Sequence, residues 1–111
     1  MKVTRSETLG PESRPVVIPP GFGPASVSQV KGEVTLDNGL WWSGAPMVLN
    51  LEIPADKIRL YEIVLSEGSA ADITEFITFS ELITFWHSLY LPRHVKRGWE
   101  SWFQNQGIEL A

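Results

Sequence analysis

Residues 36–44, LDNGLWWSG, carry the strongest local folding signal in this 111-residue chain. Asn38 and Gly39 tolerate the positive φ angles that a two-residue type I′ turn requires at both of its central positions. The stretch therefore predicts a β-hairpin with its turn at Asn38-Gly39. Because adjacent strand residues point to opposite faces of a sheet, Trp41 and Trp42 cannot both enter the same core.

The two-residue turn also predicts which strand residues face each other. In this register Leu36 lies opposite Trp41, and Thr35 lies opposite Trp42. The first pair shares its face with Val34, and we expect this apolar face to join the core. Trp42 lies on the more polar face, which makes it the best single candidate for a partner contact if nothing else covers it.

Residues 1–26 are rich in proline and glycine and contain five of the eight prolines. Such a stretch excludes a helix or a central strand. We therefore predict a flexible or extended arm over residues 1–26, followed by one small domain over residues 27–111. Ile18 and Phe22 are more apolar than a solubilising tail requires. Either the arm lies on its own domain, where these side chains would cover Trp42, or it orders on a partner.

The fold class follows from a change of apolar period after the hairpin. Residues 47–53, MVLNLEI, alternate as a half-buried strand does, which predicts a third strand and a small antiparallel meander. From Pro54 the apolar residues repeat with a helical period, which predicts a helix to about Ser66 that Gly68 ends. The chain is thus expected to be an α+β protein, with a meander followed by four short helices.

Start and stop residues predict the other three helices. Ser69–Asp72 and Thr78–Glu81 both have the spacing of a capping box, in which the first and fourth residues bind each other's backbone N–H groups. Thr78–Glu81 has the preferred glutamate and predicts a helix to about Tyr90, whereas Ser69–Asp72 is the weaker box. Pro92 begins the last helix, and Gly107 ends it.

The first and third predicted helices carry apolar residues on more than one face. Either they are the central helices of the domain, or part of their apolar surface contacts another protein. Leu60 and Val64 on the first helix and Phe85 on the third are the candidate partner contacts under the second alternative.

The composition narrows the possible functions. A formal net charge of −4 and a pI near 5.1 argue against a protein built to bind phosphate backbones. The absence of cysteine excludes disulfides and thiol nucleophiles. No apolar run has the length of a signal peptide or a membrane span. We expect a cytoplasmic protein that has no membrane segment.

The sequence offers few candidates for catalysis. His87 and His94 have no partner at metal-ligand spacing, and neither a GxSxG elbow nor a P-loop is present. We interpret the acidic residues of the helical half as a solvated face; they are Glu62, Glu67, Asp72, Glu75 and Glu81. The sequence therefore predicts no enzyme, no catalytic residue, no cofactor and no metal.

Two kinds of binding protein remain. Five tryptophans and five phenylalanines make the chain aromatic-rich, and aromatic side chains dominate protein interfaces as well as cores. The alternative is a small DNA-binding regulator that contacts phosphate through Arg93, Lys96 and Arg97. The helix at 79–90, which would be the recognition helix, has no Lys or Arg and contains Glu81. This pattern favours protein binding over nucleic-acid binding.

Three segments carry a resemblance to a known group of proteins: Trp42-Ser43-Gly44, RLYEIVLSEG at 59–68 with Asp72-Ile73, and LPRHVKRGW at 91–99. They resemble small actinobacterial proteins encoded beside nucleotidyltransferase toxins of the AbiEii type. The resemblance covers about residues 41–103. It implies an antitoxin that neutralises its toxin by direct contact, and a basic toxin would suit the acidic chain. It supplies no catalytic residues and leaves the oligomeric state open.

Overall fold

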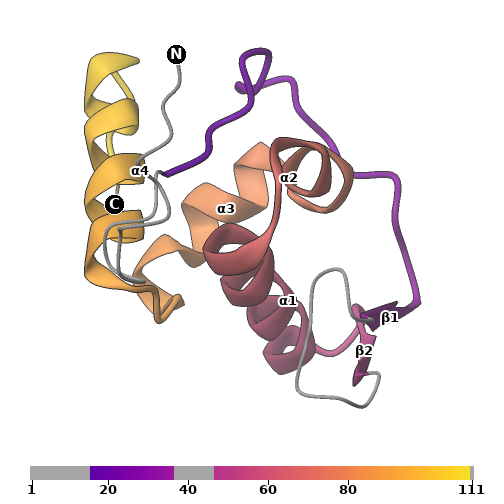
Figure 1. Cartoon of the computed structure of the whole chain (residues 1–111). Coiled ribbons are helices and arrows are strands. Elements are labelled where there is room, and N and C mark those ends of the chain that lie inside the picture. Colours follow the sequence, from indigo (N-terminus) through magenta and orange to yellow (C-terminus); the bar gives the residue numbers. More distant parts are fainter. Residues whose placement is uncertain (1–15, 37–46, 111) are drawn as a thin grey trace, which may run out of the picture.

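The structure is a computed structural model, which describes residues 16–36 and 47–110. It confirms an α+β fold in which a two-stranded antiparallel hairpin precedes four α-helices (Figure 1). The elements are β1 (Glu33–Leu36), β2 (Met47–Asn50), α1 (Pro54–Glu67), α2 (Ala70–Phe76), α3 (Phe79–Phe85), the 3₁₀ helix η3 (Trp86–Ser88) and α4 (Arg93–Asn105).

The hairpin places one apolar face on the helices. Val34 lies opposite Leu49 and Leu36 lies opposite Met47. Val34, Leu36 and Leu49 are buried, which confirms the predicted core face of the first strand. The exposed residues alternate with them, as the two-residue period of a strand requires.

The observed strand pairing differs from the predicted three-stranded meander. In a meander, a strand at 40–42 would separate the strands on either side of it and make them parallel to each other. Instead, β1 pairs directly with β2 in the antiparallel sense, and Leu36 takes Met47 as its partner. The predicted turn at Asn38-Gly39, and with it Trp41 and Trp42, lies outside the described residues.

The bounds of α1 and α2 follow their local sequence signals. Pro54 opens α1, and the Gly68 N–H donates to the Val64 carbonyl at its end over 2.8 Å. At the start of α2, the Asp72 N–H donates to the Ser69 hydroxyl over 3.2 Å. The Asp72 carboxylate accepts from the Ser69 N–H over 2.9 Å in return. The capping box at Ser69–Asp72 is therefore confirmed.

The start of α3 is where predicted, but its predicted capping box is wrong. Neither the Thr78 side chain nor the Glu81 side chain caps the helix. The Thr78 hydroxyl accepts a hydrogen bond from the Ser28 N–H, and the Glu81 carboxylate binds Tyr61 and Lys57 on α1. Partners from distant parts of the chain have displaced the local ones.

The third predicted helix is also shorter than expected. It ends at Phe85 and turns into η3 instead of continuing to Tyr90. The buried Trp86 ring packs edge-on against Phe103, and its indole N–H donates to Glu100 on α4. The predicted last helix is confirmed as α4, which Gly107 follows with a positive φ of 74°.

The described part of the N-terminal arm packs against the domain. Phe22 is buried. The centroid of its ring lies 5.6–5.9 Å from the ring centroids of Phe79, Trp99 and Trp102. Farther toward the N-terminus, Val16 covers Gly98 so closely that a Cβ there would lie 2.7 Å from its Cγ2. Of the two alternatives for the arm, residues 16–26 show packing on the chain's own domain.

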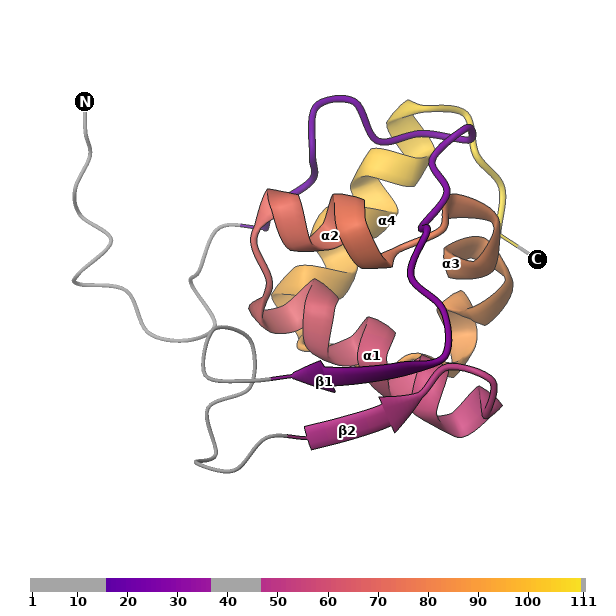
Figure 2. The same ribbon diagram turned by 90° about the vertical axis from the view of Figure 1, so that its right-hand side faces the viewer.

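The hairpin and α4 lie on opposite sides of the molecule, with α1, α2 and α3 between them (Figures 1 and 2). No helix of the described ranges 16–36 and 47–110 has the length and apolar character needed to cross a membrane.

Candidate functional site

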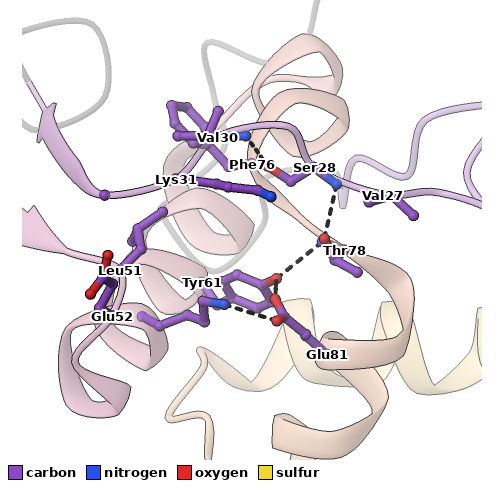
Figure 3. A pocket seen from close by; sticks show the side chains of 12 residues that line it. Val27, Ser28, Val30, Lys31, Leu51, Glu52, Tyr61, Phe76, Thr78 and Glu81 are labelled. Atoms are coloured by element: carbon purple, nitrogen blue, oxygen red, sulfur yellow. Dashed lines mark hydrogen bonds and ion pairs between the residues drawn. The ribbon is translucent and has the colours of Figure 1, made fainter.

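A pocket of about 370 Å³ opens where the hairpin meets the helices (Figure 3). Residues 27–32, which lead into β1, form one wall. The opposite wall comes from the start of α1 and from the connection between α2 and α3. Three segments that are far apart in the sequence therefore build it.

A hydrogen-bonded network forms the polar wall of this pocket. The Tyr61 hydroxyl donates to Glu81 Oε1 over 2.7 Å and accepts from the Thr78 N–H over 3.0 Å. Lys57 Nζ donates to Glu81 Oε2 over 2.8 Å and forms an ion pair with it. Figure 3 shows these contacts converging on Glu81. The network joins α1 to the start of α3.

The electrostatics of the network keep Tyr61 protonated and Glu81 ionised at neutral pH. Burial is the largest cause that raises the pKa of Tyr61, and the neighbouring Glu81 carboxylate raises it further. Burial alone would also raise the pKa of Glu81. The hydrogen bonds from Lys57 and Tyr61, together with the charge of Lys57, outweigh it and hold that pKa below its ordinary value. At neutral pH Tyr61 is thus a donor and Glu81 an ionised acceptor.

The outer wall of the pocket is tied to the helices by hydrogen bonds. The Ser28 N–H donates to Thr78 Oγ1 over 2.9 Å, and Ser28 Oγ donates to the Glu75 carbonyl over 2.7 Å. The Phe79 N–H donates to the Ser26 carbonyl over 3.0 Å. These bonds fix the position of the wall relative to α2 and the start of α3.

The rest of the lining combines apolar side chains with the cationic side chain of Lys31. Val27 is 61% exposed, while Leu51 and Phe76 are half-buried. Lys31 extends across the pocket above Tyr61 (Figure 3). Among the described residues, Lys31 has no hydrogen bond or ion pair, so its ammonium group is available to a ligand.

The structure corrects two predicted partner contacts. Leu60 and Val64 are completely buried, because α1 is covered by the sheet on one side and by other helices elsewhere. They are core residues and present no surface to a partner. Phe85 is half-buried and packs edge-on against Tyr61, with the ring centroids 5.9 Å apart.

The predicted partner contacts on the arm, Ile18 and Phe22, also pack against the domain. Phe22 is part of the aromatic core, and Ile18 is half-buried against it. Whether they cover Trp42 is not described, because Trp42 lies outside the described residues. Neither Ile18 nor Phe22 is a freely exposed contact.

The three basic residues are exposed. Arg93, Lys96 and Arg97 all lie on the solvent-facing side of α4, while Val95 and Trp99 face the core. The basic cluster and the hairpin therefore occupy opposite sides of the molecule (Figure 1). In the described ranges, no group of three His, Asp or Glu residues has the arrangement of a metal site.

Sequence reasoning missed several exposed or pocket-lining side chains. Val48 on β2 is 57% exposed and alternates with the apolar side of the run at 47–53, whereas Ile53, which belongs to that apolar side, is 47% exposed. The observed strand register, in which Val48 lies opposite the exposed Thr35, shows why Val48 points outward. Lys31 carried no motif that could have marked it.

In comparisons with protein-family models, with curated proteins and with solved structures, no match to this chain was found.

Proposed function

We propose that this chain is a non-catalytic protein-binding module. The observation that carries the proposal is the hairpin surface, defined as Thr35, Val48 and Ile53. Val48 is 57% exposed on the sheet face opposite the one packed on the helices, and Ile53, three residues after β2 at the start of α1, is 47% exposed. An aliphatic side chain exposed on a sheet face is available to contact another protein.

The specific form of the proposal is an antitoxin that inhibits a nucleotidyltransferase toxin by direct contact. It is supported by the resemblance over residues 41–103 to small actinobacterial antitoxin-like proteins. The net charge of −4 suits a toxin with a basic surface, because complementary charge speeds association and disfavours wrong partners. The proposal requires a nucleotidyltransferase gene beside the gene of this chain.

The test is co-expression and co-purification of that nucleotidyltransferase with this chain. We expect a complex in which the transferase is inhibited stoichiometrically, with no turnover by this chain. The variant Val48→Lys should weaken the complex roughly tenfold or more, because it places a charge in an apolar contact. Gln104→Lys, an exposed change on α4, is the matched control and should bind as wild type. A fully active, unbound transferase would contradict the proposal.

The second candidate function is DNA binding through Arg93, Lys96 and Arg97. It is favoured by the exposure of all three side chains on one helix. A mobility-shift assay at two salt concentrations tests it, since phosphate contacts weaken steeply as salt rises. A shift at low salt that is lost when all three residues are changed to Gln supports this function. No shift at low salt removes it.

A further inference from the structure

We propose that the pocket beside the hairpin binds a monocarboxylate that carries a compact apolar group. The carboxylate would lie at Lys31, and the apolar group would lie among Val27, Leu51 and Phe76. This inference is independent of the antitoxin proposal, which rests on the hairpin surface and on the resemblance.

The first support is the size of the pocket and the anchoring of its wall. Its volume of about 370 Å³ is near the lower end of the range typical of small-molecule sites, roughly 300–1,000 Å³. The wall that contains Val27 and Lys31 is fixed at Ser28 and Ser26 by hydrogen bonds to the α2–α3 region. Binding a ligand would therefore order little additional chain, and the entropy loss that weakens binding to a mobile segment would be small.

The second support is the unused hydrogen-bonding capacity of the pocket. Both Glu81 oxygens already accept bonds, one from Tyr61 and one from Lys57. Lys57 donates one of its three N–H groups to Glu81. Within the described residues, the Lys31 ammonium group donates no hydrogen bond. The donors left for a ligand are thus the ammonium groups of Lys31 and Lys57, which favour an anion beside them, while the Glu52 carboxylate remains an acceptor.

The third support is the apolar part of the lining. Val27 is largely exposed at the rim, and Leu51 and Phe76 offer further half-buried apolar surface. Covering these side chains releases water from apolar surface and adds affinity that a bare inorganic anion would lack. The ligand is therefore expected to be amphipathic.

The charge of the lining favours a carboxylate over a phosphate. Lys31 and Lys57 are balanced by Glu52 and Glu81, which also line the pocket. Figure 3 shows the Glu52 carboxylate at the rim, apart from the Lys31 nitrogen. A doubly charged phosphate would meet stronger repulsion from these two carboxylates than a singly charged group would.

The ligand chemistry has two possible sources, a free small acid or the C-terminal carboxylate of a peptide chain. Isocaproate represents the first source, and N-acetyl-dileucine represents the second. Each is titrated into the full chain while its backbone amide resonances are followed by NMR. The amides of isocaproate and of N-acetyl-dileucine serve as uncharged controls.

We expect saturable shifts at Ser28, Lys31, Leu51 and Thr78, with a Kd on the order of 1 mM for so small a ligand. The uncharged amides should bind about tenfold more weakly, because they lose a charge-assisted hydrogen bond. Tighter binding of the peptide acid would assign the site to a chain terminus, and tighter binding of isocaproate would assign it to a free acid.

Two variants sharpen the result. Lys31→Gln, an exposed change, should weaken carboxylate binding about tenfold and bring it level with the amide. Lys96→Gln on α4 is the matched control and should leave binding unchanged. The proposal is overturned if neither acid gives saturable shifts at these residues, if acid and amide bind equally, or if Lys31→Gln has no effect. None of these results bears on transferase inhibition, so the two proposals fail separately.

Discussion

The starts of α2 and α3 lie nine residues apart and have the same four-residue spacing of a capping box, yet they are built differently. At α2, Ser69 and Asp72 bind each other's backbone N–H groups, as the sequence predicts. At α3, the N–H groups of Thr78 and Phe79 donate to the Tyr61 hydroxyl and to the Ser26 carbonyl instead. The start of α2 is therefore capped by residues within the same turn, whereas the start of α3 is held by residues distant in the sequence.

The difference shows when a local capping motif is overridden. Ser69 is exposed, so no distant group competes for its partners. Thr78 lies between Ser28 and α1, and there Ser28 and Tyr61 bind the same groups that a capping box would use. The contacts that replace the box also form the polar wall of the pocket. The following predictions separate the tertiary start of α3 from the local start of α2.

The largest expected effect comes from removing the anchor of the arm. Phe22→Ala should lower the free energy of unfolding by about 3–5 kcal/mol, the range for truncating a buried phenylalanine. It should also loosen the Ser26–Phe79 hydrogen bond at the start of α3, because the arm loses its buried anchor. Urea denaturation monitored by tryptophan fluorescence measures the loss. Val17→Ala, at an exposed arm position, is the control, and a similar small loss in both variants would contradict the packing of the arm.

The second effect concerns the hydroxyl that joins α1 to α3. Tyr61→Phe should lower the free energy of unfolding by about 1–3 kcal/mol, because it leaves the partly buried Thr78 N–H without an acceptor and Glu81 Oε1 without its donor. Thermal and urea unfolding measure it. Tyr90→Phe removes the same atom from a side chain that is 87% exposed, and it should change stability little. Equal effects of the two variants would show that the network does not stabilise the fold.

The third effect is the loss of the local cap of α2. Asp72→Ala should cost about 0.5–1 kcal/mol, because the capping contacts are exposed to water. Circular dichroism during urea unfolding measures it, with Thr74→Ala as an exposed control on the same helix. If Asp72→Ala costs as much as Tyr61→Phe, the distinction between the two helix starts is lost.

The smallest effect is a pH dependence at the start of α3. The pKa of Glu81 is lowered in the folded chain, so its ionised form stabilises the fold above the ordinary pKa of 4.5, and this contribution fades as the pH falls through the lowered value. The effect should be modest because the Glu81 side chain is 37% exposed. Unfolding of Glu81→Gln followed below pH 5 should show a shallower acid dependence than wild type. Identical acid profiles would exclude a role for this carboxylate.

Local signals were enough to predict the fold class and most helix bounds. Pro54 and Gly68 delimit α1, and Gly107 follows the end of α4, because proline and glycine act on the backbone wherever they occur. The exception is the end of α3, where the buried Trp86 belongs to a tertiary contact with α4. The strand pairing also failed, because the turn signal at Asn38-Gly39 implies a partner strand at 40–42 in place of β2.

The candidate site was beyond the reach of local patterns. Its hydrogen bonds include pairs 17 to 53 positions apart, such as Tyr61 with Thr78 and Ser26 with Phe79. In the sequence, Tyr61 is one of several apolar residues of α1. No residue near it in the sequence indicates that its hydroxyl binds Thr78 and Glu81. Leu60 and Val64 were predicted as candidate partner contacts, but both are buried in the core. The broad apolar face of α1 is therefore that of a central helix and not of an interface.

Native-state hydrogen exchange of single backbone amides tests the tertiary start of α3 most directly. The amides of Ser28, Thr78 and Phe79 should be protected in wild type, and all three should exchange faster together in Tyr61→Phe, while the Asp72 amide keeps its wild-type rate. Protection at Thr78 that is unchanged by Tyr61→Phe, or lost in step with Asp72, would contradict the account.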